Sequence, residues 1–196
     1  MTGIIILAAG SSSRFGSPKQ NLVYQGKTLL QRAIQTALTS ASCENVLVVL
    51  GANEDEIRPN ISDQQVNIAY NPQWAEGMAS SIRLGIAELQ KLEPLTTSAI
   101  LMLCDQPFVD SWLIYQLTER KAENDCGIVA CEYKNTFGVP ALFDKKHFGE
   151  LETLTGNDGA KKLIGLYPDD VATVPFALGA IDIDTIEDYE RLNNRA

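Results

Sequence analysis

The chain has 196 residues, of which 45% are hydrophobic and 21% charged, and its formal net charge is −9. This size and composition predict one globular domain over residues 1–196. The acidic charge disfavours nucleic acid as a partner, and no apolar stretch reaches the roughly 20 residues of a membrane helix, so no membrane contact is expected. The N-terminus lacks a signal-peptide pattern, and the four cysteines show no metal-binding spacing. We therefore expect a cytoplasmic protein with reduced thiols.

Apolar runs that predict strands alternate along the chain with spacings that predict amphipathic helices. Several of the strands are apolar on both faces, which is typical of parallel strands covered by helices on both sides. The fold class is therefore α/β, a single-domain Rossmann-like, mostly parallel sheet with helices on both faces. Strands are expected at 2–7, 45–50, 66–70, 99–103, 127–131, 140–143 and 180–183, and helices at 27–41, 79–91, 111–123, 145–151, 158–166 and 186–193.

A segment of small residues follows the first predicted strand, and residues 8–19 read Ala-Ala-Gly-Ser-Ser-Ser-Arg-Phe-Gly-Ser-Pro-Lys. Small side chains leave backbone N–H groups uncovered, so that these groups can point at phosphate oxygens, and Arg14 and Lys19 can neutralise charge on the same ligand. Ligands of open α/β sheets bind outside the carboxyl ends of the strands. The segment is neither a Walker A loop nor a dinucleotide fingerprint, which argues against a P-loop kinase or GTPase and against a nicotinamide dehydrogenase.

With Leu7 at its start, this segment resembles the Leu-Ala-Ala-Gly-x-Ser-x-Arg-x-Gly-x-Pro-Lys signature of nucleotidyltransferases that join an NTP to a phosphorylated acceptor. The resemblance is closest to the molybdenum cofactor cytidylyltransferase (MocA-like) family of the MobA-like NTP transferase superfamily. It implies a fold like that of the nucleotide-diphospho-sugar transferases, with Arg14 and Lys19 as catalytic residues. The implied nucleotide-binding residues of this segment are Leu7, Ala8, Ala9, Gly10, Ser11, Ser12, Arg14 and Lys19.

Asp105 directly follows the most apolar predicted strand and begins Asp105-Gln106-Pro107. A carboxylate at such a position is costly without a cation, and Mg²⁺ takes one or two carboxylates together with phosphate oxygens and waters. The alternative is a turn that Asp105 begins and Pro107 bends. In the family that this chain resembles, the aspartate of a similar segment binds the metal. The resemblance therefore implies that Asp105 contacts both Mg²⁺ and the nucleotide.

A second metal ligand is expected in the acidic segment near the C-terminus. On the predicted strand 180–183, Asp182 and Asp184 would share a face, because side chains alternate with a period of two. We predict Asp182 as the ligand and keep Asp184 as the fallback. Asp184 or Thr185 could instead cap the following helix.

Two further groups of residues come from weaker resemblances. Residues 77–81 resemble a Gly-Met-x-x-Ser segment that borders the nucleotide base in the family, although a serine pair here could also simply cap a helix. Two later loops resemble stretches on the acceptor side. The implied base-side residues are Gly77, Met78, Ser80 and Ser81, and the implied acceptor-binding residues are Gly138, Pro140, Gly156 and Asp158.

His147, the only histidine, is expected at the surface, so a Ser/His/Asp hydrolase is excluded.

The resemblance implies Mg²⁺-dependent transfer of CMP from CTP to the phosphate of molybdopterin, with release of pyrophosphate. It implies a molybdenum hydroxylase as the client that receives the product. Three alternatives stay open: guanylyl transfer to the same cofactor, cytidylyl transfer to a sugar or polyol phosphate, and a non-catalytic chaperone that delivers the cofactor.

Overall fold

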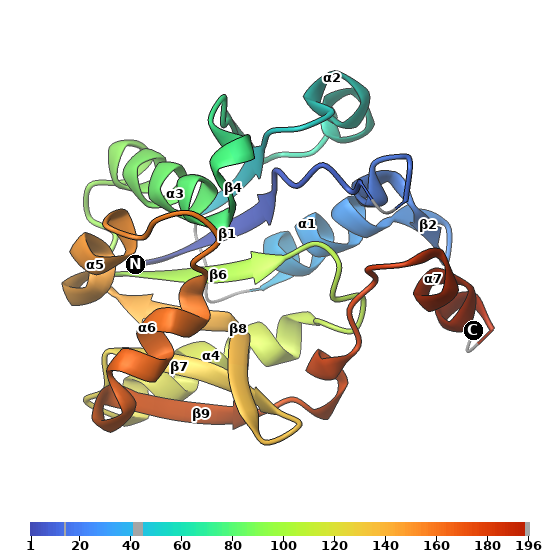
Figure 1. Ribbon diagram of the computed structural model, residues 1–196. Coiled ribbons are helices and arrows are strands. Elements are labelled where there is room, and N and C mark those ends of the chain that lie inside the picture. The colour runs from blue at the N-terminus through green and yellow to red at the C-terminus, as the bar shows by residue number, and fades with distance from the viewer. Residues whose placement is uncertain (14, 41–44, 195–196) are drawn as a thin grey trace.

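The computed structural model describes residues 1–13, 15–40 and 45–194. Its centre is a seven-stranded sheet with the strand order β5-β4-β1-β6-β8-β7-β9 (Figure 1). Strand β8 runs antiparallel to its two neighbours, and the other neighbouring pairs are parallel. The prediction of a mostly parallel sheet is confirmed. The strands are β1 (Thr2–Ala8), β4 (Asn45–Leu50), β5 (Asn67–Tyr70), β6 (Ser98–Leu103), β7 (Ile128–Tyr133), β8 (Thr136–Asp144) and β9 (Val171–Pro175).

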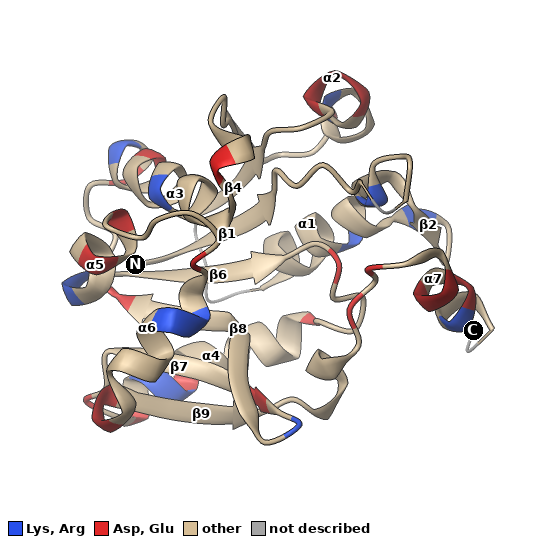
Figure 2. Ribbon diagram, in the orientation of Figure 1, with Lys and Arg blue, Asp and Glu red and all other residues tan. Residues whose placement is uncertain are grey.

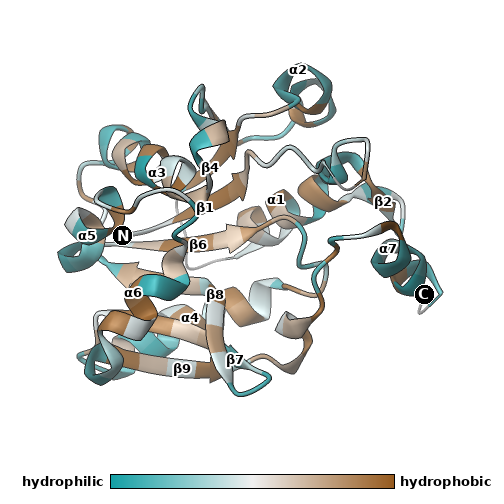
Figure 3. Ribbon diagram, viewed as in Figure 1, coloured by the Kyte–Doolittle hydropathy of each residue, from teal (hydrophilic) through white to brown (hydrophobic). Residues whose placement is uncertain are grey.

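Helices cover both faces of the sheet, as its apolar strands require. Ile4 and Ile6 of β1 pack on the face covered by α1 (Leu29–Thr39) and α4 (Ser111–Glu123). Ile5 and Leu7 pack on the opposite face, under α3 (Met78–Leu92), α5 (Phe148–Glu152) and α6 (Ala160–Leu166). Figure 3 shows β1 and β4 largely in the brown of hydrophobic residues. The central strands therefore bury both of their faces, which is why they lack the polar alternation of a half-exposed strand.

Short elements complete the fold beyond the two main helical layers. A small hairpin, β2 (Val23–Tyr24) and β3 (Lys27–Thr28), lies beside α7 (Ile186–Asn193), while α2 (Glu54–Ile57) follows β4 (Figure 1). Tyr24 and Leu29 form a separate buried cluster with Ile183 and Leu192. The C-terminal part of the chain is thus packed against the segment that follows β1. Over residues 1–13, 15–40 and 45–194, every helix is too short or too polar to serve as a membrane span.

The strand predicted at 180–183 is wrong. Residues 177–180 form a 3₁₀ turn, and residues 181–184 have no regular structure. The backbone N–H of Ile183 donates to the carbonyl oxygen of Asp105 at 3.0 Å, so this segment bonds to the loop after β6 instead of joining the sheet. The sheet instead gains β9 as its edge, a strand that the sequence did not reveal because it is short and ends at Pro175.

The prediction of a surface-exposed His147 is also wrong. Its side chain is buried, with Nε2 2.8 Å from Asp170 Oδ2 and the ring against Tyr167. The carboxylate of Asp170 provides a hydrogen-bond partner for Nε2, whereas Nδ1 is buried without one among the described residues. This contact fixes the segment before α5 to the segment before β9.

Candidate functional site

A cavity of about 390 Å³ opens at the carboxyl ends of β1 and β6. Its size lies within the range of pockets that hold small molecules. Its position is the one predicted for a ligand of an open α/β sheet. The lining residues are Leu7, Ala8, Ala9, Gly10, Ser11, Lys19, Gln20, Trp74, Ala75, Gly77, Met78, Ser81, Leu103, Cys104, Asp105 and Asn157.

One end of this cavity is charged. Lys19 Nζ lies 2.5 Å from Asp105 Oδ2 and 3.1 Å from Asp184 Oδ1. Burial lowers the pKa of Lys19, but the negative charge of Asp105 and the hydrogen bonds to both carboxylates outweigh it and hold the pKa above its ordinary value. Lys19 is therefore a permanent cation at the carboxyl end of the sheet, where Figure 2 shows the acidic residues of the loop after β6 and of the segment before α7.

The small-residue segment after β1 is held in shape by Gln20. Its Nε2 donates to the carbonyl oxygens of Ala8 at 2.8 Å and Gly10 at 2.9 Å. The hydroxyl of Ser12 donates to Gln20 Oε1 and accepts from the backbone N–H of Lys19. Ser12 thus connects parts of the loop and does not line the cavity. Sequence reasoning missed Gln20, and the one available signal was an amide side chain placed directly after the expected cation.

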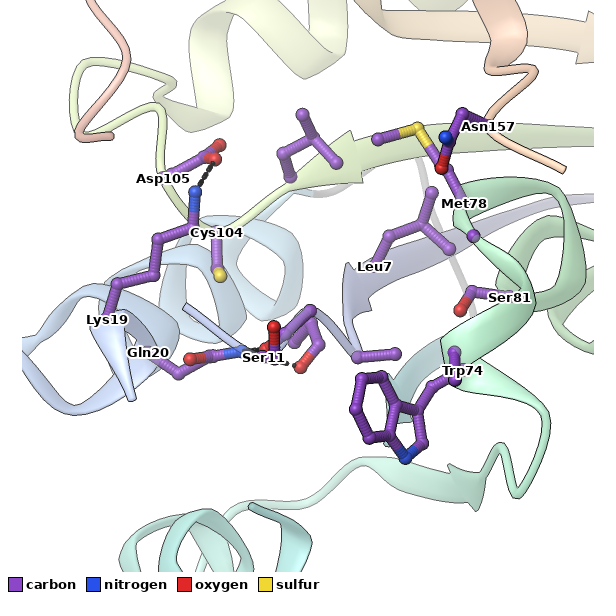
Figure 4. A pocket seen from close by; sticks show the side chains of 16 residues that line it. Leu7, Ser11, Lys19, Gln20, Trp74, Met78, Ser81, Cys104, Asp105 and Asn157 are labelled. Carbon is purple, nitrogen blue, oxygen red and sulfur yellow. Dashed lines mark hydrogen bonds and ion pairs between the residues drawn. The ribbon is translucent and has the colours of Figure 1, made fainter. Parts of the chain in front are cut away.

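The other end of the cavity is uncharged. Figure 4 shows Trp74, Met78, Ser81 and Asn157 at this end, away from Lys19 and Asp105, with Leu7 between the two ends. An aromatic ring, a thioether and two neutral polar groups suit a planar, uncharged part of a ligand. Trp74 and Asn157 were not predicted, although a tryptophan in an otherwise polar segment was a usable signal.

The two serines of α3 have different places. Neither caps the helix, since the N-cap residue is Gly77. Asn71 Nδ2 donates to both hydroxyls at 2.9 Å, and Ser80 Oγ also donates to the carbonyl oxygen of Gly77. Ser81 lines the cavity, whereas Ser80 lies behind it and fixes the turn before the helix.

The carboxylates near Lys19 fit a divalent cation. Asp105 is 8% exposed, and its Oδ1 is buried without a hydrogen-bond partner among the described residues. Partial loss of solvent raises the pKa of Asp182, and the negative charges of Asp105 and Asp184 raise it further. A cation among these carboxylates would stabilise their ionised forms, and carboxylate oxygens are ligands that Mg²⁺ prefers.

These residues do not form a complete metal site by themselves. Over residues 1–13, 15–40 and 45–194, no three His, Cys, Asp or Glu side chains are arranged to hold a metal ion. Asp105 and Asp182 could therefore supply only part of the coordination. Phosphate oxygens of a ligand and water would have to supply the rest, which is how Mg²⁺ is commonly held.

The four residues expected on the acceptor side fall into two places. Gly138 and Pro140 flank Val139, whose carbonyl oxygen accepts from Gln106 Nε2 at 3.2 Å, so they lie beside the residue after Asp105. Gly156 instead lies against the start of α3, because its carbonyl oxygen accepts from the backbone N–H of Ala79. Asp158 is paired with Lys162 at 2.7 Å and does not line the cavity. The predicted acceptor group is therefore split between the charged and the uncharged end of the site.

Most of the predicted nucleotide-binding residues meet at this cavity, but two of the predicted residues need comment. Arg14 lies outside the described residues. Asp182 lines a smaller cavity of about 230 Å³ next to Lys134 and Arg191, not the larger one. It is Asp184, the fallback, that touches Lys19 directly.

Comparisons with known proteins identify the family of this chain. Residues 4–171 match the model of the MobA-like NTP transferase domain. Nicotine blue oxidoreductase of Paenarthrobacter nicotinovorans is 28% identical over 98% of this chain and 96% of its own length. Molybdenum cofactor cytidylyltransferase of Escherichia coli is 32% identical over 44% of each chain.

A solved structure shares almost the whole fold. Rv0371c of Mycobacterium tuberculosis superposes with a TM-score of 0.85 at 28% identity, covering 98% of this chain and 97% of its own. Its complex with manganese gives a TM-score of 0.82 at 26% identity over 100% of this chain and 98% of its own. The family match spans β4 to β8 and most of β1, the small-residue segment after β1 and the loop after β6. The chain therefore belongs to the MobA-like NTP transferase family.

Proposed function

We propose that this nucleotidyltransferase transfers CMP from CTP to the phosphate of molybdopterin and releases pyrophosphate. The observation that supports it is a single cavity with Lys19 and Asp105 at one end and Trp74, Met78 and Asn157 at the other. A nucleoside triphosphate has two ends that match those of the cavity: a polyanion for the charged end and an aromatic base for the uncharged end. The choice of CTP and of a pterin acceptor rests on the similarity to molybdenum cofactor cytidylyltransferase.

The mechanism needs positioning and charge neutralisation more than a general base. An acceptor phosphate is already an anion, so it can attack the α-phosphorus of CTP in line while pyrophosphate leaves. Lys19, a permanent cation, would stabilise the charge that develops at the α-phosphate, and Arg14 would hold the β- and γ-phosphates with its planar set of donors. A divalent cation bound at Asp105 and Asp182 would neutralise phosphate charge. The manganese complex of Rv0371c supports the use of a divalent metal by this chain.

The test is pyrophosphate release from each of the four NTPs, with and without molybdopterin-bound molybdenum, at fixed Mg²⁺. We expect release with CTP only when the acceptor is present. Release with GTP would assign guanylyl transfer, and release only with a sugar or polyol phosphate would assign a different acceptor. If no NTP released pyrophosphate in the presence of molybdopterin-bound molybdenum, the result would favour a cofactor-delivery chaperone.

A second candidate follows from the likeness to nicotine blue oxidoreductase, which extends over nearly the whole chain. The cavity offers no reactive thiolate for electron transfer, because burial and the charge of Asp105 raise the pKa of Cys104 to about 12. An oxidoreductase would thus need a bound electron donor, and the dinucleotide fingerprint is missing. Incubation with NADH or NADPH and a blue quinoid dye separates the two functions. Dye bleaching without pyrophosphate release under any condition would assign the oxidoreductase.

A further inference from the structure

The loop of residues 155–159 lies directly on the start of α3. Its Gly156 carbonyl oxygen accepts from the backbone N–H of Ala79 at 3.1 Å. Gly77 has φ of 110°, and a Cβ there would lie 2.4 Å from the Gly156 oxygen and 2.6 Å from Asn157 Oδ1. Only glycine at position 77 therefore lets this loop approach the helix so closely. The two segments form one wall of the uncharged end of the cavity.

Adjacent residues of this loop face different surroundings. The carboxylate of Asp158 pairs with Lys162 and accepts from the hydroxyl of Thr155, so it points away from the cavity. Asn157 lines the cavity beside Met78 (Figure 4). Its side-chain amide has no hydrogen-bond partner within the part of the chain that the structure describes. A donor and an acceptor are therefore available to a ligand at this position.

This end of the cavity is unsuited to phosphate. Lys19, at the far end, is the only Lys or Arg among the described lining residues. The start of α3 is not an open anion site either, because the N–H groups of Ala79 and Ser80 donate to the carbonyl oxygens of Gly156 and Gly77. Backbone donors that are already paired cannot bind a phosphate.

The same end suits a flat, neutral ring with polar atoms on its edge. Figure 4 shows Met78 and Asn157 on one side and Trp74 on the other, with Leu7 and Ser81 between them. Trp74 is held in place by a close backbone approach, since a Cβ on Gly51 would lie 2.6 Å from Trp74 Cβ. Aromatic rings bind bases by stacking, and an amide side chain can accept from an exocyclic amine while donating to a ring nitrogen.

We infer that Asn157 contacts the base edge of the bound nucleotide, so that the loop of residues 155–159 belongs to the nucleobase site and not to the acceptor site. The amide oxygen accepts from the exocyclic amine of cytosine, the amide nitrogen donates to the adjacent ring nitrogen, and Trp74 supplies the apolar wall. This inference rests on the proposed function, because it takes the ligand to be CTP.

The experiment compares two probes by calorimetry in the presence of Mg²⁺: CTP and inorganic tripolyphosphate, which has no base. Asn157→Ala is expected to weaken CTP binding about two- to tenfold, the usual value of one or two net hydrogen bonds, and to leave the Kd of tripolyphosphate unchanged. Lys161→Ala, on the exposed surface of α6 directly after this loop, is the matched control and should change neither Kd. Unchanged melting temperatures establish that both variants are folded.

Each other outcome overturns the inference. Equal CTP binding by Asn157→Ala and the unmodified chain would mean that Asn157 does not touch the base. Equal losses for CTP and tripolyphosphate would mean that the loop only shapes the cavity. If the unmodified chain bound CTP no better than tripolyphosphate, there would be no base site. Failure of the proposed function looks different: CTP would bind, with the Asn157→Ala effect present, but no pyrophosphate would form with any acceptor.

Discussion

Lys19 Nζ lies 2.5 Å from Asp105 Oδ2, and this ion pair joins the segment after β1 to the loop after β6. Asp184, from the segment before α7, joins the same cation at 3.1 Å. Asp105 and Asp184 lie 86 and 165 residues from Lys19 along the chain, so three distant segments meet at one charge. The side chain of Lys19 is 18% exposed and that of Asp105 12%, so removing either partner would leave the other charge largely buried and unpaired.

Lys19→Ala is expected to lower pyrophosphate release by about two to three orders of magnitude, the usual effect of losing one preorganised charge-stabilising donor. It should also lower the melting temperature, because Asp105 keeps a largely buried charge without its main partner. Thermal unfolding and a pyrophosphate assay measure the two effects separately. Lys91→Ala, on the exposed surface of α3, is the control and should change neither.

The double variant Lys19→Ala/Asp105→Asn separates stability from catalysis. Removal of both charges should restore part of the melting temperature lost in Lys19→Ala, while activity stays absent. A double variant as unstable as Lys19→Ala would contradict the electrostatic explanation.

Asp105→Asn keeps the shape of the loop but removes the charge proposed to bind the metal. We expect near-complete loss of pyrophosphate release at ordinary Mg²⁺, with partial rescue at high Mg²⁺ or by Mn²⁺, which accepts similar oxygen ligands. The half-saturating metal concentration for nucleotide binding should rise in parallel. Full activity of this variant at ordinary Mg²⁺ would show that Asp105 does not bind the metal and serves only as a structural partner of Lys19.

The core of the fold could be predicted because its signals are local. The apolar runs at residues 2–7, 45–50 and 99–103 correspond to strands that bury both faces, and the helix predicted at 186–193 has those bounds in the structure. Strand β9 could not be predicted, because only its pairing with β7 distinguishes it from a loop. The strand expected at 180–183 is absent because Ile183, its one fully buried apolar residue, packs with the α7 cluster and bonds to the loop after β6 instead of pairing with a strand.

The cavity was predictable at its charged end and less so at its uncharged end. Lys19 and Asp105 follow strand ends, so topology alone places them together. Asn157 and Gln20 depend on how loops fold back, which no periodic pattern encodes. The burial of His147 likewise depends on Asp170, which lies 23 positions away and carries no local pattern that predicts the pairing.

Thr185→Ala is expected to lower the free energy of unfolding by about 1 kcal/mol, the typical value of an N-cap. The structure makes Thr185 the cap of α7: its hydroxyl accepts from the backbone N–H of Asp188, and Asp188 Oδ2 accepts from the N–H of Thr185. Denaturant titration measures the change, and pyrophosphate release should be kept. A stability equal to that of the unmodified chain would contradict the capping role.

Asp182→Ala is expected to abolish pyrophosphate release with little change in melting temperature, because Asp182 is exposed and is the proposed second metal ligand. Asp184→Ala should leave the cap of α7 intact and act through Lys19, which it contacts. Its activity should fall less than that of Asp182→Ala. A larger loss of activity in Asp184→Ala than in Asp182→Ala would indicate that Asp184 is the second metal ligand. Full activity in both variants would leave Asp105 as the only protein carboxylate on the ion.

The Asp170 carboxylate, which bonds to the buried His147, predicts how stability changes with pH. Partial burial raises the pKa of Asp170, but hydrogen bonds from Lys146, His147 and the backbone N–H of Gly127 outweigh it and lower the pKa from 3.8 to about 2. Because folding lowers this pKa, the ionised carboxylate stabilises the native state fully above about pH 4, and this contribution is lost as the pH falls towards 2.

Asp170→Asn should therefore lower the free energy of unfolding at pH 7 and flatten its decline between pH 4 and pH 2. Denaturant titrations at pH 7, 5, 4, 3 and 2 measure both effects. Asp169→Asn is the matched control, since Asp169 is exposed and adjacent in the chain. Nucleotide binding should be unaffected in both variants, because Gly127 and Asp170 directly precede β7 and β9, outside the cavity at the carboxyl ends of β1 and β6. If the free energy of unfolding of Asp170→Asn varied with pH as in the unmodified chain, the charge of Asp170 would contribute nothing to stability.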